Sequence, residues 1–283
     1  MFAGDIEIPR INEEIRDLIL QRASDDFDWS LISPTIFGAV FESTLNPETR
    51  RAGGMHYTSI ENIHKVIDPL FLNDLKAELA DIKATSVAKT KKMRAYAFQD
   101  KLAGLKFFDP ACGSGNFLTE SYTSLRRLEN EALRIIYGGD RVMGEMADPI
   151  KVHINQFYGI EINDFACSVA QTALWIAESQ MMRETDEIVD FNLNPLPLKT
   201  YNNIHEGNAL RMDWNNVIPA ADLDYIMGNP PFLGARIMSA EQKDDLISVF
   251  GAKWKNIGNM DYVTGWYKKS LEMMKINPQI QAA

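Results

Sequence analysis

The chain has few cysteines, and it also lacks a long apolar run. Cys112 and Cys167 are the two cysteines, in segments expected to be a loop and a helix, so reduced thiols are expected rather than a disulfide framework. The four histidines and two cysteines lack zinc spacing, and no metal site is expected. No uncharged apolar stretch is long enough to span a bilayer, so we expect a cytoplasmic protein without a membrane partner.

Positive charge is also in short supply. The chain has 29 Lys and Arg against 39 Asp and Glu, a formal net charge of -10. Phosphate binding needs clustered Lys and Arg, so this balance excludes a protein that wraps nucleic acid with its whole surface. The dense basic run comprises Lys89, Lys91, Lys92 and Arg94. A solvated helix face is the favoured interpretation, and a local DNA contact is the alternative.

What is present fits a globular chain of 283 residues with a sizeable core, since 46% of the residues are apolar. Residues 9–101 show helical spacing of apolar positions and predict a helical N-terminal layer. Thr58 and Glu61 stand at capping-box spacing and predict a helix start. The helix that follows is expected to bury Ile60, Ile63, Val66 and Ile67. Residues 73–101 are charged and helix-prone, typical of a connector.

From residue 105 the pattern changes to short apolar runs that alternate with long amphipathic segments. The expected strands cover 105–108, 157–162, a run ending at 207–210, and 223–227. Two helices lie between them, with core faces of Leu118, Tyr122, Leu125 and Leu128 in the first and Val169, Ala173, Leu174, Ile176 and Ala177 in the second. This alternation is typical of βαβ units and predicts an α/β fold with a parallel sheet.

The loops that follow these strands carry unusual residues. In open parallel sheets ligands bind beyond the carboxyl ends of the strands. Gly113 and Gly115 remove side chains after the first strand, so that backbone N–H groups can face a carboxylate or a phosphate. Glu161 is placed to accept hydrogen bonds from ribose hydroxyls, Ile162 to pack on an adenine face, and Asn208 to pair with the adenine amino edge. The alternatives are a tight turn, a solvated carboxylate and a turn residue.

A nicotinamide dinucleotide is the obvious competing ligand. The third glycine of G-x-G-x-x-G is Leu118 here, and the acidic residue comes later than usual, after an inserted segment from Tyr137 to Lys151. A nucleoside cofactor without a pyrophosphate fits better.

The most informative segment is Asn229-Pro230-Pro231-Phe232. Two consecutive prolines fix the backbone and remove two donors, which leaves carbonyl acceptors with a set direction. The Asn229 side chain and the Pro230 carbonyl can take both hydrogens of an exocyclic amine and favour its attack on a sulfonium methyl group. Phe232 is expected to stack on a base that has been flipped out of a duplex. The alternative is a rigid loop with its aromatic packed inward.

These segments together resemble the motifs of adenine-N6 DNA methyltransferases in their gamma arrangement. The glycine loop resembles motif I, residues 158–162 the ribose-binding motif, residues 207–210 the adenine-binding motif, and residues 229–232 the catalytic motif IV. Residues 54–59 resemble the motif that contacts the methionine part of the cofactor. The helical N-terminal part is similar to the segment that joins nuclease and methyltransferase in single-chain type II restriction-modification enzymes.

The resemblance implies a class I S-adenosylmethionine-dependent methyltransferase, with a Rossmann-like sheet and a helical N-terminal layer. Residues 1–101 would form the helical region with the methionine-contact motif, and 102–283 the catalytic domain, truncated at its C-terminal side. The implied reaction is methyl transfer from S-adenosyl-L-methionine to adenine N6, with double-stranded DNA carrying a flipped adenine as partner and the target recognition region missing. Implied cofactor-binding residues are Tyr57, Thr58, Asp109, Pro110, Ala111, Cys112, Gly113, Ser114, Gly115, Asn116, Phe117, Glu161, Ile162, Asn208, Ala209 and Asn229; implied catalytic residues are Asn229, Pro230, Pro231 and Phe232.

Two other functions share parts of this pattern. An amide or RNA-base methyltransferase would use the same acceptor tetrapeptide, and an inactive module would bind cofactor without turnover. A nuclease is not favoured, because Glu241-Gln242-Lys243 lacks partnered acidic residues on strands and is better interpreted as a surface helix.

Overall fold

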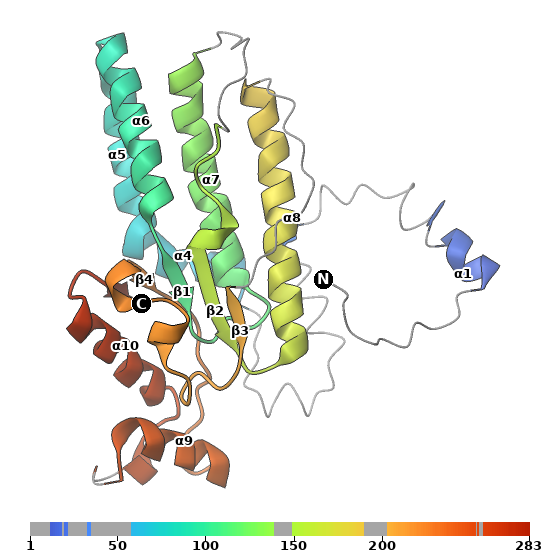
Figure 1. The fold of residues 1–283 in the computed structure, drawn as a ribbon, viewed down its shortest axis with the longest axis vertical. Helices are drawn as coiled ribbons and strands as arrows, with labels where there is room; N and C mark the ends of the chain where they lie inside the picture. Colours follow the sequence, from blue (N-terminus) through green and yellow to red (C-terminus); the bar gives the residue numbers. More distant parts are fainter. Residues whose placement is uncertain are drawn as a thin grey trace. The chain divides into compact units, whose positions relative to one another are not determined.

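The computed structural model describes residues 12–18, 20–21, 33–34, 58–138, 149–189, 203–252, 254 and 257–283. The chain divides into two units, residues 1–33 and 34–283. In the first unit a short helix, α1 (Glu13–Asp17), begins at Asn12, whose side chain accepts a hydrogen bond from the Ile15 amide at 2.8 Å. All elements discussed below belong to the second unit (Figure 1). Tyr57 and most of the expected helical segment before it lie outside the described residues.

A helical layer opens the described part of the second unit. It comprises α4 (Ile60–Ile67), a π-helical turn η3 (Asp68–Leu72), α5 (Asn73–Ala84) and α6 (Ala88–Gly104). The expected capping pair is wrong by one residue, because the Ser59 side chain caps α4 by accepting from the Asn62 amide. Ile63 and Ile67 are buried as expected, but Ile60 is 37% exposed because it sits in the first turn, ahead of the packed face.

The α/β part alternates strands and helices as the sequence predicts. Its elements are β1 (Phe107–Asp109), α7 (Asn116–Tyr137), η4 (Ile154–Gln156), β2 (Phe157–Glu161), α8 (Asp164–Val189), β3 (Ile204–Glu206), η5 (Trp214–Asn216), η6 (Ala220–Asp222), β4 (Tyr225–Ile226), α9 (Ala240–Phe250), η7 (Ile257–Asn259), α10 (Thr264–Ile276) and β5 (Gln281–Ala282). The described strands pair in parallel in the order β3-β2-β1-β4-β5. The chain therefore reverses direction across the sheet at β1, where loops of neighbouring strands diverge and leave room for a ligand.

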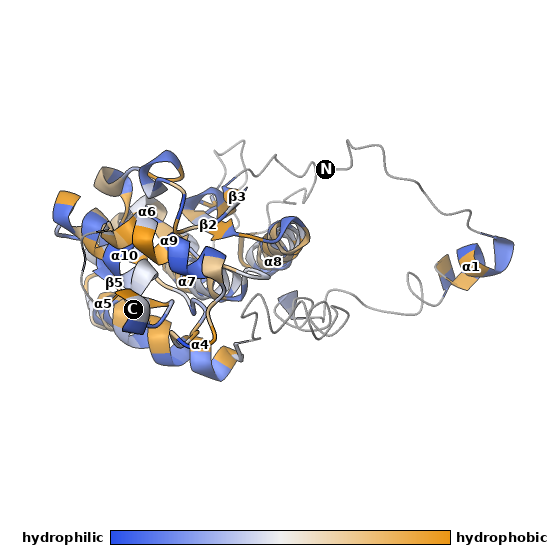
Figure 2. Cartoon of the chain, turned by 90° about the horizontal axis from the view of Figure 1, so that it is seen from below, coloured by the Kyte–Doolittle hydropathy of each residue, from blue (hydrophilic) through white to orange (hydrophobic). Residues whose placement is uncertain are grey.

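The two faces of the sheet bury separate cores. Phe107 and Phe108 are consecutive on β1 and point to opposite faces. Phe107 stacks on Phe157, with ring centroids 5.0 Å apart, in the core shared with α4, α5, α6, α7 and α8. Phe108 contacts Trp214 in the core shared with α9 and α10. Figure 1 shows these helices around the sheet, and Figure 2 shows hydrophilic and hydrophobic residues side by side along them, as expected of helices with one buried face.

The helices that flank the sheet bury the faces expected from their sequences. Along α7 the four expected core residues are buried, and along α8 four of the five are buried while Ile176 is partly exposed. Helices α4, α5 and α6 pack into the same hydrophobic core as α7. The expected division into a helical region, residues 1–101, and a catalytic domain, residues 102–283, therefore stays a proposal about what the two segments do. In the part of the chain that the structure describes, no helix is long and apolar enough to cross a membrane.

Candidate active site

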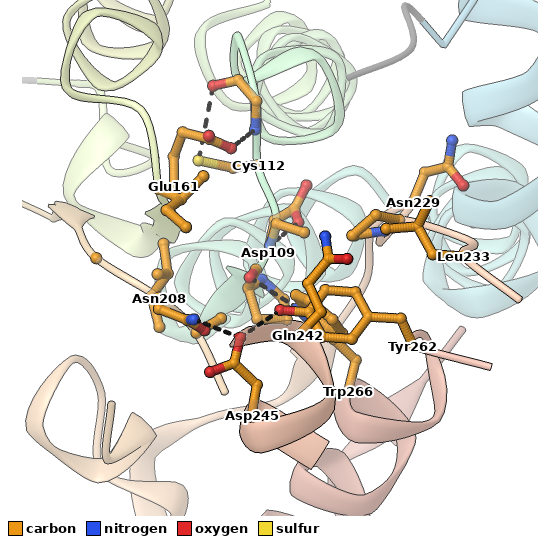
Figure 3. Close-up of a pocket in the computed structure, with 18 of the residues that line it drawn as sticks. Asp109, Cys112, Glu161, Asn208, Asn229, Leu233, Gln242, Asp245, Tyr262 and Trp266 are labelled. Carbon is orange, nitrogen blue, oxygen red and sulfur yellow. Dashed lines mark hydrogen bonds between the residues drawn. The ribbon is translucent and has the colours of Figure 1, made fainter. Parts of the chain in front are cut away.

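A cavity of about 820 Å³ lies where β1, β2, β3 and β4 end, within the size range of small-molecule sites. Figure 3 shows the side chains that converge on it from these loops, from α9 and from the segment around α10. Of the residues expected to bind or react, the cavity is lined by Thr58, Asp109, Pro110, Ala111, Cys112, Gly113, Ser114, Asn116, Phe117, Glu161, Ile162, Asn208, Ala209, Asn229 and Pro231. Gly115, Pro230 and Phe232 are near it in sequence but do not form its lining.

The glycine loop between β1 and α7 is shaped by two residues with positive φ. Gly113 (φ 53°) lines the cavity. Gly115 (φ 80°) has a different role, because a Cβ there would lie 2.9 Å from the Ala170 Cβ on α8. The Cys112 amide donates to the Ile160 carbonyl at 3.0 Å, which holds the loop against β2. Gly115 thus sets how closely α7 approaches α8, while Gly113 lines the cavity without a side chain.

Glu161 joins the ends of two strands through its carboxylate. It is buried, with Oε2 accepting from the Gly113 amide and Oε1 from the Asn163 amide, both at 3.0 Å. Burial raises the pKa of the Glu161 carboxyl above its ordinary value. A carboxylate oxygen can accept more than one hydrogen bond, so both oxygens keep acceptor capacity for ligand hydroxyls.

Asp109 connects the glycine loop to the segment after β4. Its Oδ1 accepts from the Ala111 amide at 3.0 Å. Burial, with a smaller effect from the charge of Glu161, raises the pKa of Asp109 to about 7. A Cβ on Gly228 would lie 2.4 Å from Asp109 Oδ1, and Gly228 has a φ of 156°. Only a glycine lets the backbone before Asn229 come this close to the first loop, so the acceptor tetrapeptide lies beside the glycine-lined end of the sheet.

The tetrapeptide after β4 is held by contacts from other elements. The Asn229 amide nitrogen donates to Thr58 Oγ at 3.3 Å, which turns its amide oxygen away from that contact. Leu233, directly after the tetrapeptide, donates its amide to Asp261 and accepts from the Tyr262 amide at 2.9 Å. Phe232 is 64% exposed. The alternative of an aromatic packed inward is therefore wrong, because this ring is left at the surface.

The side-chain amide of Asn208 makes a hydrogen bond through its nitrogen and another through its oxygen. Nδ2 donates to Asp245 Oδ2 at 2.8 Å, and Oδ1 accepts from the Leu210 amide at 2.9 Å. Asp245 is buried, and it also accepts from the Tyr262 hydroxyl at 2.7 Å and from Arg211. Burial alone would raise the pKa of Asp245, but these hydrogen bonds together lower it below its ordinary value.

The lining residues that sequence reasoning did not propose for the site include Asp245 on α9, Tyr262 just before α10, and Trp266 on α10. The Trp266 indole donates to the Pro110 carbonyl at 3.0 Å and so braces the glycine loop. Asp245 follows Lys243 and Asp244 in a segment whose charged residues predict a solvent-exposed helix face. Nothing in the neighbouring sequence indicates that Asp245 is buried. The expected helix through residues 241–243 is confirmed as the start of α9.

Comparisons with known proteins place the chain in a family. The family model described as the MmeI DNA-methyltransferase domain matches residues 84–283. DNA methyltransferase A of Bacillus subtilis (strain 168) is 41% identical over 255 residues, which are 89% of this chain and 28% of that protein. A Methanocaldococcus jannaschii protein, named as a type II restriction enzyme and methyltransferase, is 26% identical over 167 residues, 52% of this chain and 14% of its own length.

A solved structure gives the same result for the fold. The type IIL restriction-modification enzyme MmeI in complex with DNA matches with a TM-score of 0.87 and 40% identity, over 99% of this chain and 36% of that one. The chain thus spans about a third or less of the relatives it matches. The expected class I S-adenosylmethionine-dependent methyltransferase fold is confirmed, as is the resemblance to the methyltransferase part of restriction-modification enzymes. The chain belongs to the family of MmeI DNA-methyltransferase domains.

Proposed function

We propose that this chain transfers a methyl group from S-adenosylmethionine to the N6 amine of adenine in DNA, within a restriction-modification protein. The observation that carries the proposal is the approach of Gly228 to Asp109, which brings the acceptor tetrapeptide and the glycine loop to one cavity. A methyl donor and an amine acceptor must meet within near-attack distance for transfer, so the two segments have to share one space.

The residues of the cavity fit the proposed cofactor. The N-terminal end of α7 reaches the cavity through Ser114 and Asn116, and a helix N-terminus suits a carboxylate. Glu161 offers acceptors for ribose hydroxyls. Ser114 Oγ and Asn116 Oδ1 are buried without a hydrogen-bond partner in the described residues, although both side chains belong to the lining. Buried polar atoms are normally satisfied, so their position favours a polar ligand here.

The reacting amine would be held by the tetrapeptide. S-adenosylmethionine, when bound, supplies a methyl group on a positively charged sulfur. The Asn229 amide oxygen and the Pro230 carbonyl then accept the two amine hydrogens and favour a tetrahedral nitrogen with its lone pair toward the methyl group. The contact between Asn229 and Thr58 holds the Asn229 side chain beside the cavity. No strong base is required, because the alkylated amine is acidic enough to lose a proton to neutral acceptors or water.

The substrate base has to leave its duplex before this geometry can form. An adenine amine inside a DNA helix is paired, and flipping costs a few kcal/mol of stacking and pairing. Phe232, the exposed last residue of the tetrapeptide, is available to stack on the flipped base and offset part of that cost. The relatives named as DNA methyltransferases, and the MmeI complex with DNA, support DNA as the substrate.

The proposal is tested by incubating the chain with unmethylated genomic DNA and S-adenosylmethionine labelled in its methyl group. Genomic DNA offers every recognition sequence, so the assay does not depend on knowing one. Mass spectrometry of the nucleosides should find the label in N6-methyldeoxyadenosine. Absence of label in the DNA, with label found instead in parallel reactions on RNA or on protein, would overturn the substrate. Heat or a thermal shift with S-adenosylmethionine but no labelled product would favour a module that binds cofactor without turnover.

A further inference from the structure

Asp245 is a buried carboxylate in the cavity wall with no assigned role. It lies on α9 and is 4% exposed, yet both of its oxygens are engaged. Oδ2 accepts from Asn208 and from the Tyr262 hydroxyl, and Oδ1 accepts from Arg211. Burying a carboxylate is costly unless donors surround it, so a position that gathers three donors is a built arrangement rather than a surface side chain.

The consequence of this arrangement is a fixed orientation of the Asn208 amide. Its nitrogen faces the Asp245 carboxylate and its oxygen faces the Leu210 N–H. A reversed amide would place its oxygen against the carboxylate and its NH2 group against the N–H. Both contacts would then be repulsive, so the amide oxygen is held in one place. That oxygen keeps a second lone pair, and Asn208 belongs to the lining of the cavity.

The position of Asn208 indicates which part of a ligand it meets. Glu161 and Glu206 pair across the neighbouring strands β2 and β3, and the Gly207 amide donates to the Glu161 carbonyl at 2.8 Å. A nucleoside whose ribose hydroxyls bind Glu161 therefore extends its base toward the loop after β3, where Asn208 and Ala209 lie. Figure 3 shows Asn208 and Asp245 on the same side of the cavity, joined by their hydrogen bond.

We infer that Asp245 is a positioning residue: by holding the Asn208 amide, it presents an acceptor oxygen that selects a cofactor base with an exocyclic amine. The inference rests on the proposed function, in which the base is the adenine of S-adenosylmethionine. An adenine amine donates to the Asn208 oxygen. Hypoxanthine carries a keto oxygen at the same position. That oxygen would face the Asn208 oxygen, and because two acceptors repel each other the base would bind more weakly.

The test compares two ligands by calorimetry: S-adenosylhomocysteine and its analogue with a keto oxygen in place of the 6-amino group. The native chain should bind the adenine compound about tenfold or more tightly, since a site built for a hydrogen bond rejects a mismatched group. Asp245→Ala and Asp245→Leu should reduce the preference to about threefold or less, because only the Leu210 N–H then holds the Asn208 amide and either end can turn to the base more easily. The leucine variant fills the space that alanine leaves, which protects the fold.

Asp244→Ala and Asp244→Leu are the matched controls, since Asp244 is the exposed neighbour on the same helix with the same charge. They should keep the native preference. A merely structural role for Asp245 would weaken both ligands equally and leave their ratio unchanged, which would overturn the inference.

A measurement on the native protein covers the case in which no Asp245 variant folds. The side-chain amide protons of Asn208 should exchange with water much more slowly than those of the exposed Asn216, because the group is held by Asp245. Exchange as rapid as that of Asn216 would overturn the inference. Failure of the native chain to bind either ligand would instead overturn the proposed function, so the two failures are distinguishable.

Discussion

Asn229 is the residue on which the proposed chemistry depends most. Its amide is placed by Thr58, a residue 171 positions away in the sequence. The residue before it, Gly228, approaches Asp109. Activation of an amine by neutral acceptors requires such placement, because oxygen acceptors lower the barrier only when they face the position where charge develops.

Asn229→Ala should reduce methyl transfer by about two orders of magnitude or more, a loss of roughly 3 kcal/mol of transition-state stabilisation. Affinity for S-adenosylmethionine should stay within a few-fold, because Glu161 and the glycine loop are unchanged. Single-turnover kinetics and calorimetry measure the two quantities. Asn216→Ala, an exposed residue of η5 that does not line the cavity, is the control. Equal activity of the two variants would show that the tetrapeptide is not catalytic.

Asp109 predicts a pH dependence of stability. Its pKa is raised from 3.8 to about 7 in the folded chain, so between these values the folded state holds a proton that the unfolded state has lost. The stabilisation is complete below the unfolded pKa and is lost as pH rises through the folded one. The Asp109→Asn variant has no carboxyl at this position, so its stability lacks this pH-dependent contribution at every pH. Urea unfolding of ligand-free protein should therefore show the native chain losing about 2–3 kcal/mol relative to this variant between pH 5 and pH 8. Parallel curves would contradict the prediction.

At the scale of elements, the distance between α7 and α8 is set at one point. Gly115 starts α7 in a left-handed conformation, and the nearest atoms to a Cβ there belong to Ala170 of α8, including its Cα at 3.1 Å. Neither the backbone conformation nor this contact tolerates a side chain without a shift of the helices.

Gly115→Ala should lower the free energy of unfolding by about 2 kcal/mol or more, through strain and collision together. It should also weaken cofactor binding, because the displaced helix carries the glycine loop. Thermal unfolding with and without S-adenosylmethionine measures both effects. Gly104→Ala is the matched control: it ends α6, has no positive φ, and a Cβ there meets nothing within 4 Å. A Gly115 variant as stable as the Gly104 variant would contradict the packing argument.

Elements differ in how well their sequences revealed them. The helices α7 and α8 are long and amphipathic, so their spacing identified their buried faces. Strand β5 was not predicted from the sequence. It consists of Gln281 and Ala282 at the edge of the sheet, and two residues are too few to show an alternation of apolar and polar positions. The start of α4 was displaced by one residue because Thr58 and Ser59 are both good caps, and only the hydrogen bond from Asn62 distinguishes them.

At the scale of the whole molecule, the formal net charge is -10, so the proposed contact with DNA has to be made by local surfaces. The basic run at Lys89, Lys91 and Lys92 is near the start of α6, and the chain enters β1 only after that helix ends. The cavity lies beyond the opposite end of β1, so the run is separated from it by most of α6 and by the strand (Figure 1). Arg94 is already paired with Asp81.

Reversing these charges tests the alternative that the run contacts the substrate DNA. The triple change Lys89→Glu, Lys91→Glu and Lys92→Glu should leave methyl transfer and its salt dependence within about twofold of native, since phosphate contacts would otherwise steepen the salt slope. A rate measured at several salt concentrations checks this. A large loss of activity, with unchanged affinity for S-adenosylmethionine, would show that DNA reaches α6.

The sequence alone determined that the loops after β1, β2, β3 and β4 carry the candidate site, because parallel strands end at one edge and local motifs at those ends must meet there. The glycine loop, Glu161, Asn208 and the tetrapeptide were recognised for this reason, although their proposed roles stay predictions. Tertiary structure alone decided that Asp245 and Trp266 belong to the cavity. Their burial depends on packing between α9, α10 and loops far away in the chain, and such long-range contacts leave no periodic signal in the residues around them.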